Sequence, residues 1–425
     1  MKHLKVMLVA ALFAAPFVTR AEDAPKVTFN AGGLLILNGF ANHGDLDSRE
    51  LPRFAYDNGQ ASDSRAFGMA ARQSRLNASI GIPTEGLLAG AALKAFVEAD
   101  FAYDAKSADT VAPRMRHYYI TSTWKDLGNL TLLVGQTWGV AGGSVPALFP
   151  VSLAHWVMPR FGGAGFAFRR APQVRVSADA PVPGPFALSA AVAALTPGDS
   201  GSALSASKGN DAAFPNFEGR ISGAYKPDGK PLAEVGLWTH YGREKYMGAT
   251  YDALTANSQA FGADVKVTVP FVTFIGTVFQ GKNLDVLASI AGMSAAAPSA
   301  TNATTGVIID NTTDPLHPKA IEMKTKGGFL QAIVSPVKPL QLMVGAGMEN
   351  PDDKTLALPG AVIASNMITK NTQYTAGAVV ALTSKWKVSL EATRYLTQVS
   401  KNDPANDNRD VIPATQFEMG SVVSF

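Results

Sequence analysis

The sequence predicts an all-β fold, a transmembrane antiparallel β-barrel of about 16 strands with short turns at one end and long loops at the other. Segments of about 11 to 15 residues, in which apolar and polar side chains alternate, recur along the chain. The connections between them are short and long in turn, and the chain ends on such a segment with Phe425. Long strands in an even number, joined by turns of alternating length, are typical of barrels that span a membrane.

The first 21 residues have the pattern of a secretory signal peptide. Two lysines precede an apolar stretch at 6–18, and a small residue, Ala21, marks the expected cleavage site. A membrane anchor is the alternative, but the stretch is shorter than the roughly 20 residues that a spanning helix needs. No Pro/Ser linker, charge block or shift in composition divides the rest of the sequence. We therefore expect a signal peptide at 1–21 and one barrel at 22–425.

The charge balance and the lack of cysteine exclude several classes of protein. Lys2, Lys5 and Arg20 lie in the signal peptide, which leaves 37 − 3 = 34 basic residues against 34 acidic ones. Such a neutral chain implies no nucleic-acid partner. Without cysteine there is no disulfide framework, thiolate metal site or cysteine nucleophile. No later segment approaches 18 uninterrupted apolar residues, which excludes helical membrane spans.

About 16 strands are expected, each bounded by residues that favour turns, such as Pro, Gly and Asp. They lie at 27–40, 66–82, 90–104, 113–124, 129–138, 165–180, 185–197, 214–226, 231–243, 256–269, 271–282, 319–335, 337–349, 370–383, 386–399 and 412–425. The long loops between them are 41–65, 105–112, 139–164, 198–213, 244–255, 283–318, 350–369 and 400–411.

The last strand explains why the chain ends on an aromatic residue. In lipid, every backbone N–H and C=O must be satisfied within the protein, so the last strand has to pair with the first and close the sheet. Phe425 then lies at the periplasmic rim, and we expect it to act as the assembly signal. Aromatic girdles are expected at both rims, the lower one from Trp124, Tyr225, Phe271 and Trp386, and the upper one from Phe101, Tyr103, Trp138, Tyr241 and Tyr395.

Five motifs in the first half of the chain resemble a known family. They are RQSRLNASI (72–80), VEADF (97–101), PRMRHYY (113–119), LLVGQTW (132–138) and RAPQVRV (170–176). Their order and spacing are similar to those of the DcaP-like trimeric porins of Gram-negative outer membranes, and GTVFQGKNL (276–284) fits as well. The resemblance implies an outer-membrane homotrimer that acts as a diffusion channel. That family can carry a helical segment before the first strand, and here few residues separate Ala21 from Val27, so barrel walls would hold the trimer.

Strand parity assigns side chains to the lipid or to the lumen. Apolar residues such as Leu76, Ile80 and Val97 mark the outward face. The opposite face of the same strands is polar and rich in arginine. The residues expected to line the pore are Arg75, Lys94, Glu98, Asp100, Arg114, Arg116, Tyr118, Arg169 and Arg175, with Glu218, Arg220, Glu234 and His240 further round.

The third long loop, at about 139–165, is expected to fold into the barrel as a constriction. It is rich in Gly and Pro and contains no Asp or Glu; its charge is Arg160, and His155 titrates near neutral pH. The narrowest section is therefore expected to be electropositive. The alternative is that the lumen arginines are wall ion pairs, because Arg75 and Arg114 lie on strands next to that of Glu98 and Asp100.

Three polar residues do not fit the parity of their strands. Arg72, His117 and Gln136 fall on the outward side near the extracellular end. Either they snorkel to lipid headgroups, or this wall is a protomer interface, as the resemblance to trimeric porins implies. A β-bulge is a further expectation at 169–172, since adjacent arginines cannot share a face and proline cannot donate to a ladder.

The sequence contains no catalytic signature. GxSxG and HExxH are absent, and no pair of histidines in the mature chain has metal-ligand spacing. The acidic segments 45–50 and 350–354 are interpreted as solvated loops, with calcium binding as the alternative. We therefore expect no enzyme activity, no metal and no cofactor.

The function expected from these features is that of a porin in the outer membrane of a Gram-negative bacterium. It would be a passive diffusion channel for small hydrophilic solutes and would prefer anions such as dicarboxylates. Its partners would be outer-membrane lipid, further copies of the chain and small anionic or polar solutes. Two alternatives remain: a surface adhesin or receptor that uses the loop at 283–318, and, with less support, a barrel enzyme in which His117 acts with a nearby serine.

Overall fold

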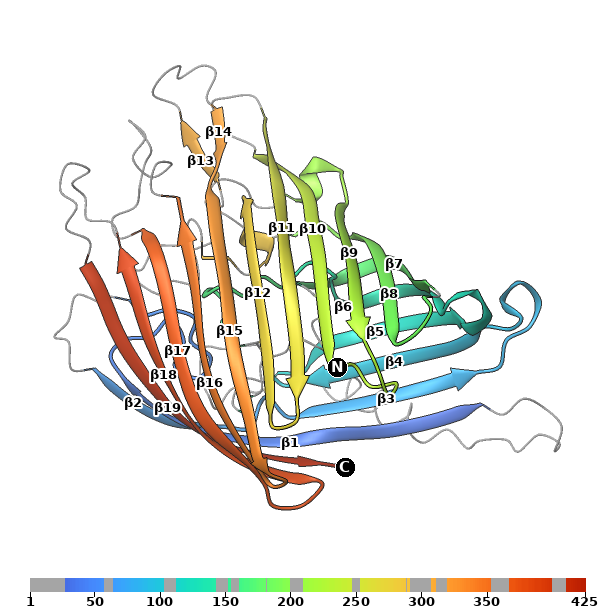
Figure 1. Cartoon of the computed structure of the whole chain (residues 1–425). Coiled ribbons are helices and arrows are strands. Elements are labelled where there is room, and N and C mark those ends of the chain that lie inside the picture. The colour runs from blue at the N-terminus through green and yellow to red at the C-terminus, as the bar shows by residue number, and fades with distance from the viewer. Residues whose placement is uncertain are drawn as a thin grey trace, which may run out of the picture.

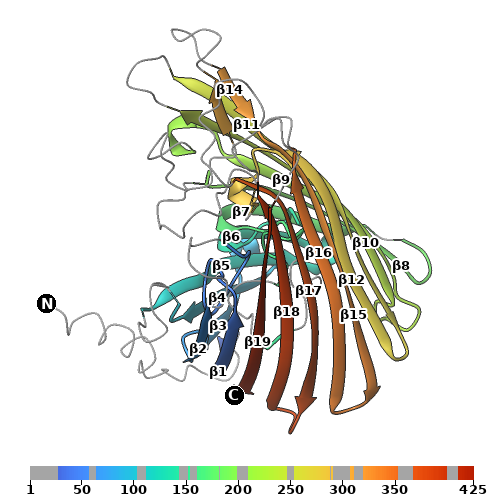
Figure 2. The same ribbon diagram turned by 90° about the vertical axis from the view of Figure 1, so that its left-hand side faces the viewer.

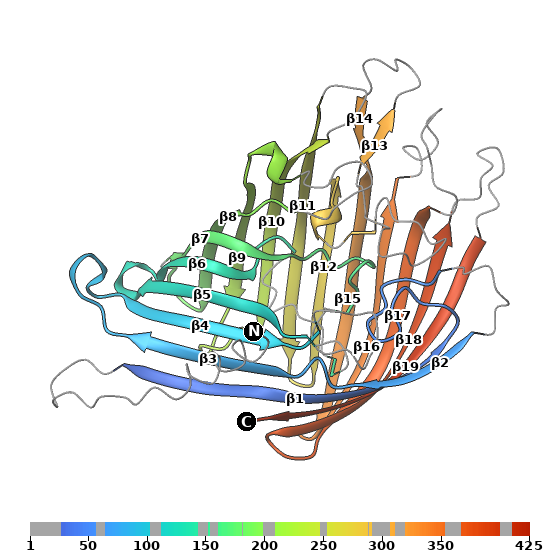
Figure 3. The ribbon, with the colours of Figure 1, turned by 180° about the vertical axis from the view of Figure 1, so that it is seen from behind.

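A computed structural model shows one closed antiparallel β-barrel (Figures 1–3). It describes residues 27–56, 64–102, 112–142, 152–153, 160–180, 182–198, 209–246, 253–287, 289–290, 307–310, 319–352, 367–399 and 410–425. The expected signal peptide at 1–21 lies outside the described residues. Within the described ranges, no helix is long and apolar enough to cross a membrane.

The described strands, of which all but β13 and β14 belong to the barrel, follow one another in chain order. They are β1 (Thr28–His43), β2 (Arg65–Ala70), β3 (Arg75–Ile82), β4 (Ala92–Asp100), β5 (Arg114–Trp124), β6 (Leu130–Trp138), β7 (Arg170–Ala180), β8 (Phe186–Leu195), β9 (Asn216–Tyr225), β10 (Ala233–Tyr246), β11 (Leu254–Val269), β12 (Val272–Lys282), β13 (Val307–Asp310), β14 (Lys319–Glu322), β15 (Lys324–Val337), β16 (Leu340–Pro351), β17 (Ile368–Ala381), β18 (Trp386–Val399) and β19 (Asp410–Ser424). Short 3-10 helices are η1 (Gly86–Leu88), η2 (Lys125–Leu127), η3 (Asn210–Ala212) and η4 (Asp285–Leu287).

The barrel has 16 strands, as predicted. The 17-stranded sheet contains β2 and β3 separately, but both pair with β1 along its length and together form one interrupted barrel strand. β13 and β14 form a separate two-stranded sheet above the barrel (Figure 1). Long strands from β10 to β18 build one tall wall, and β3 to β7 build the opposite wall (Figure 3).

The barrel closes between its first and last strands, as the terminal aromatic residue indicated. β1 pairs with β19 from Leu34 opposite Ser424 to His43 opposite Thr415, and Figure 2 shows the two strands side by side. The ladder extends to the terminal residue, because Phe425 N donates to Gly33 O at 3.2 Å and Gly33 N donates to Phe425 O at 3.3 Å. A Cβ at Gly33 would lie 2.7 Å from the Phe425 ring, so only glycine leaves room for this aromatic side chain.

Three predicted strands differ from the structure by more than a shift of a few residues at one end. The strand predicted at 66–82 is interrupted at 71–74, and the strand predicted at 165–180 begins at Arg170. The strand predicted at 319–335 is divided at Met323, which is buried. The bulge expected at 169–172 is wrong: Arg170 pairs with Trp138 and Ala171 with Thr137 in unbroken register. A register shift occurs instead in the β4–β5 pair, after Glu98.

The exterior carries the apolar side chains that a membrane-spanning barrel needs. Val192, Val278 and Leu390 are each more than 60 % exposed, and their strands alternate them with buried residues. At the rim with short turns, Phe271, Trp386 and Phe425 are exposed, and the rings of Phe186 and Tyr225 lie 5.5 Å apart. Tyr395, expected in the upper girdle, is fully buried inside, which corrects that assignment.

The interior is packed with side chains from the third long loop. Leu153, Phe161, Phe166 and Phe168 form a buried cluster with apolar residues of the surrounding strands, Ile36, Ile275, Phe329, Ile333, Met343, Val379 and Val422. The Phe161 ring stacks on Phe329 at 5.0 Å. The described parts of this loop therefore lie within the barrel, as predicted for the segment 139–165, and narrow its lumen.

Candidate pore and constriction

Wall carboxylates hold the constriction loop at two places. Glu218 Oε2 on β9 accepts hydrogen bonds from the backbone N–H groups of Val140 and Ala141, at 2.7 and 2.9 Å. Glu391 on β18 accepts from Leu153 N at 3.0 Å and from Ser152 Oγ at 2.7 Å. The loop contains no acidic residue of its own. Glu218 on one wall and Glu391 on the other hold its backbone in place.

Arg160 is paired with the wall and is not a free charge at the constriction. It is 1 % exposed, and its Nη2 contacts Glu391 Oε2 and lies 2.9 Å from Glu418 Oε2. Burial alone would lower the pKa of Arg160, but the two carboxylates outweigh it and hold that pKa above its ordinary value. The expectation that this residue makes the loop side of the pore electropositive is therefore wrong. His155 lies outside the described residues.

A signal for this ion pair was present in the sequence. Glu391 and Glu418 lie directly opposite each other in the β18–β19 pair. Two like charges in a cross-strand pair are destabilising unless a cation lies between them. β18 and β19 are neighbours, and both glutamates face inward. This placement indicates that they need a positively charged partner such as Arg160.

The opposite wall holds arginines and carboxylates on β3, β4 and β5. Arg114 forms a bidentate pair with Asp100, with Nε at 3.0 Å from Oδ1 and Nη2 at 2.6 Å from Oδ2. Arg116 contacts Glu98 at 2.8 Å and Asp100 at 2.9 Å, and Arg75 Nη1 lies 3.8 Å from Glu98. The structure therefore brings these five predicted residues together. They form ion pairs within the wall, which was the alternative interpretation of the lumen arginines.

Three further arginines around the start of β7 make no ion pair with a carboxylate among the described residues. Arg169 donates to the carbonyl oxygen of Thr196, and Arg175 Nη1 lies 3.4 Å from Trp138 O. Arg170 stacks over the Trp138 ring, with Cζ at 5.1 Å from the ring centroid. Burial lowers the pKa of Arg169, because desolvation disfavours the charged guanidinium.

We call Arg75, Arg114, Arg116, Arg170 and Arg175, with Glu98 and Asp100, the arginine wall. Arg170, which the sequence did not predict as a pore residue, lies within coulombic range of Arg116, Arg114 and Arg75. Its Nη1 is buried and makes no hydrogen bond within the described part of the chain. Five guanidinium groups against two carboxylates leave an excess of 5 − 2 = 3 positive charges on this wall.

Two of the residues predicted to face outward point inward. Arg72, in the gap between β2 and β3, is 3 % exposed and forms an ion pair with Glu50 at 2.5 Å. Gln73 donates to the same carboxylate at 3.1 Å, so Glu50 draws this segment into the barrel and interrupts the strand. His117 is buried beside Thr137, with Nδ1 at 3.0 Å from Oγ1. Both assignments to the outer face were therefore wrong.

The bulge in β5 explains the error at His117. Glu98 pairs with His117 and the next residue, Ala99, pairs with Met115, so Arg116 is the extra residue on β5. Parity reverses across such a bulge. Tyr118, predicted to face the pore, is therefore 39 % exposed on the outside.

Gln136 remains on the outer face, opposite Tyr118. Its Nε2 donates to the carbonyl oxygens of Met115 and Arg116, both at 3.2 Å, and its Oε1 accepts from the Tyr118 hydroxyl at 3.3 Å. These bonds satisfy backbone oxygens at the bulge. This patch of the outer wall is therefore polar.

Elsewhere in the described lumen, the ion pairs contain more carboxylates than guanidinium groups. Arg220 contacts Asp264 at 2.7 Å and Glu234 at 2.9 Å, and His240 Nδ1 lies 3.3 Å from Glu218. In the loop at 45–50, Asp47 contacts Arg53 at 2.9 Å. Lys94 is exposed on β4, in its half nearest the short turn. No group of three or more potential metal ligands occurs among the described residues.

The chain is similar in structure to solved outer-membrane barrels. The outer membrane channel DcaP of Acinetobacter baumannii matches with a TM-score of 0.66 and 14 % identity over 94 % of this chain and 97 % of that chain. An anion-selective porin from Comamonas acidovorans matches with a TM-score of 0.56 and 12 % identity over 94 % and 100 %. The trimer form of OmpT, an outer membrane protein of Vibrio cholerae, matches with a TM-score of 0.54 and 10 % identity over 94 % and 100 %.

These matches establish the fold. No protein-family model matches the sequence, and comparison with curated protein sequences gives no match. The chain therefore has the 16-stranded fold of outer-membrane porins, as the resemblance of its motifs predicted.

Proposed function

We propose that the protein is a passive diffusion channel in the outer membrane of a Gram-negative bacterium, with a preference for small anions. The observation that carries this proposal is the arginine wall, where five guanidinium groups face two carboxylates inside a closed barrel. The apolar exterior suits lipid, and the polar interior suits hydrated solutes. Sieving and electrostatics are the whole mechanism; no bond is made or broken.

The preference for anions follows from the excess charge of the arginine wall. In a narrow, poorly hydrated passage the effective dielectric constant falls below that of bulk water, so fixed charges act more strongly on a passing ion. A small excess of positive charge then biases entry by a few kT toward anions. The loop side adds no positive field, because two carboxylates, Glu391 and Glu418, outnumber Arg160.

Carboxylate solutes suit this wall best. A guanidinium presents its N–H donors in a planar fork that matches a carboxylate, as Arg114 already does with Asp100. Arg170 has a buried Nη1 without a partner within the described residues, and Arg175 makes one long bond to a backbone oxygen. A dicarboxylate passing the wall would exchange part of the water that it loses on entry for contacts with guanidinium groups.

A homotrimer is the assembly that we propose. The trimer form of the structurally similar Vibrio cholerae protein supports it. The polar outer patch at Tyr118 and Gln136 is the part of the wall least suited to lipid, and a neighbouring protomer would cover it. Arg72 and His117, which face inward, take no part in this interface.

Planar-bilayer conductance tests the channel against the alternatives. A channel gives stepwise current increases that persist as open pores, whereas an adhesin, receptor or barrel enzyme need give none. Most of the loop at 283–318, on which the adhesin alternative depends, lies outside the described residues. His117, named for the enzyme alternative, is hydrogen-bonded to Thr137, and no serine of the described ranges bonds to its ring.

A further inference from the structure

The chain turns into the barrel where β12 ends. Lys282 is the last residue of that strand, and Asn283 follows it with a positive φ of 52°. Asparagine tolerates this left-handed backbone, which ends the strand. The Asn283 side chain holds the turn in place, because its Nδ2 donates to Glu244 Oε2 at 2.9 Å. We call the described residues from this turn onward, 283–287 and 289–290, the strap.

The apolar side chains of the strap pack into the lumen, where Leu284, Leu287 and Ile290 are fully buried. Leu284 and Leu287 share a cluster with two wall residues and two residues of the loop between β6 and β7, namely Trp238, Phe279, Ala141 and Ala167. Leu287 O also accepts a hydrogen bond from Phe168 N at 3.1 Å. The strap therefore lies against the constriction loop and is bonded to its backbone.

Three long loops meet at Gly163 of the constriction loop. A Cβ at this position would lie 2.8 Å from Ile290 Cγ2 of the strap and 3.4 Å from Arg53 Cβ of the first long loop. Asn371 on β17 joins two of these loops, since its Nδ2 donates to Gly163 O at 2.7 Å and to Arg53 O at 2.8 Å. Ile290 is also clustered with Phe54 of the first loop. Packed loop segments therefore fill the lumen beside β17.

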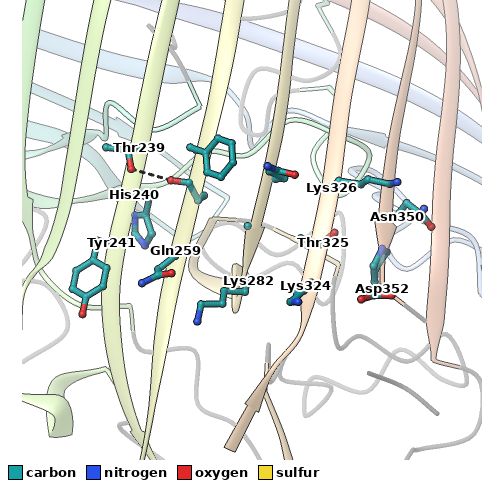
Figure 4. Close-up of a pocket in the computed structure, with 15 residues that line it drawn as sticks. Thr239, His240, Tyr241, Gln259, Lys282, Lys324, Thr325, Lys326, Asn350 and Asp352 are labelled. Atoms are coloured by element: carbon teal, nitrogen blue, oxygen red, sulfur yellow. Dashed lines mark hydrogen bonds between the residues drawn. The ribbon is translucent and has the colours of Figure 1, made fainter. Parts of the chain in front are cut away.

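Glu349 on β16 anchors the end of the strap that lies farther from β12. It is 1 % exposed, and its Oε1 accepts hydrogen bonds from Ser289 Oγ and from Ile290 N, the latter at 3.2 Å. Thr325 Oγ1 donates to the same oxygen at 3.2 Å. Figure 4 shows Thr325 and Asn350, the residue after Glu349, on neighbouring strands. One wall oxygen therefore holds both a backbone group and a side chain of the strap.

We infer that Glu349 is a positioning residue for the pore, and that the strap it holds confines solutes to the side of the lumen beside the arginine wall. The strap and the loops it contacts pack against the tall wall, whereas the arginine wall lies on β3 to β7 across the lumen (Figure 3). An ion on that side passes close to the guanidinium groups, whose attraction weakens with distance and screening. This inference rests on the proposed channel function and adds the device that keeps the solute near the charges.

Glu349→Ala, compared with Glu349→Gln, separates the position of the strap from the effect of charge. Both substitutions remove one negative charge, but glutamine keeps an oxygen that accepts the bonds from Ser289 and Ile290. Loss of the charge alone would raise the anion preference. We expect Glu349→Ala to give a higher single-channel conductance and a lower anion preference than the wild type, because ions then pass farther from the arginine wall. Glu349→Gln should keep the wild-type conductance and at least the wild-type anion preference.

Hydrogen exchange measures the strap without any current. In Glu349→Ala the backbone amides of Ile290 and Phe168 should exchange at least about tenfold faster than in the wild type, the factor that corresponds to the loss of one buried hydrogen bond. In Glu349→Gln they should exchange at the wild-type rate. The loop variant Ser289→Ala/Ile290→Ala alters no barrel strand and should reproduce the effects of Glu349→Ala, so it decides the matter if Glu349→Ala does not fold. Mobility on a detergent gel before and after boiling shows that each barrel is closed.

Unchanged exchange and unchanged selectivity in closed barrels of Glu349→Ala and Ser289→Ala/Ile290→Ala would overturn the inference. A higher anion preference in Glu349→Ala would also overturn it, because that is the effect of charge alone. A wild-type barrel that conducts no ions would refute the proposed function, whereas the exchange rates would still show whether Glu349 holds the strap.

Discussion

Glu391 and Glu418 are opposite each other on neighbouring strands, and Arg160 of the constriction loop contacts both. This buried triad joins a loop to the wall that closes the barrel. Its two carboxylates outnumber the single charge of the described loop. The positively charged part of the lumen is therefore the arginine wall on the other side.

Replacing Arg160 with Gln should destabilise the folded barrel. The change leaves two carboxylates buried opposite each other without a cation, and breaking a buried pair in this way costs about 3–5 kcal/mol. Denaturant unfolding of the detergent-folded protein measures the loss. In the background Glu391→Gln/Glu418→Gln the same change should cost far less, because no buried charge is then left unpaired. An equal loss in both backgrounds would show that Arg160 acts through packing alone.

Asp100→Asn should raise the preference for anions and lower stability together. Asp100 is fully buried and holds both Arg114 and Arg116, so its removal adds one net positive charge and takes the carboxylate partner from Arg114, while Arg116 keeps Glu98. The selectivity of single channels and the unfolding midpoint report the two effects. Asp126→Asn, which neutralises an exposed carboxylate in the η2 turn, serves as the control and should change neither.

Arg170→Gln/Arg175→Gln should reduce the anion preference without unfolding the barrel. Neither arginine has a carboxylate partner among the described residues, so no buried carboxylate is left unpaired. The excess charge of the wall falls from 3 to 3 − 2 = 1. Arg65→Gln/Arg394→Gln, at two exposed positions, makes the same change in net charge and should leave selectivity unaltered.

Gly33→Ala should impair barrel closure. The added Cβ would lie 2.4 Å from the Arg75 carbonyl oxygen and 2.7 Å from the Phe425 ring, where β1 meets the end of the chain. Deletion of Phe425 should have a similar effect, because it removes the last two bonds of the ladder. The fraction of protein that migrates as the compact, unboiled species on a detergent gel measures closure. Gly223→Ala, whose Cβ would meet only Leu188 at 3.5 Å, should fold normally.

Much of the barrel could be predicted from the sequence because side-chain alternation and closure act locally. The strand at 386–399 was predicted with the bounds that it has in the structure, and the role of Phe425 at the seam follows from unsatisfied backbone groups in lipid. The lumen positions of Arg75, Glu98 and Asp100 also follow from parity, since β3 and β4 pair in unbroken register.

The errors arose where one residue changes the register or where a contact is distant in sequence. The extra residue at Arg116 reverses the parity of β5, and no feature of PRMRHYY shows which residue is extra. Glu50 lies 22 positions from Arg72 and draws it inside. Arg160 is 231 positions from Glu391, so its neutralisation depends on the closed barrel and not on the loop sequence.

The zero-current potential across a KCl gradient tests the central claim most directly. With the wild-type protein in a planar bilayer, the potential should have the sign of chloride preference, because the arginine wall carries three excess positive charges beside the passage. Screening should reduce its magnitude at high salt. A potential of the opposite sign, which indicates potassium preference, would contradict the proposed anion preference. The arginine wall would then be a set of structural ion pairs.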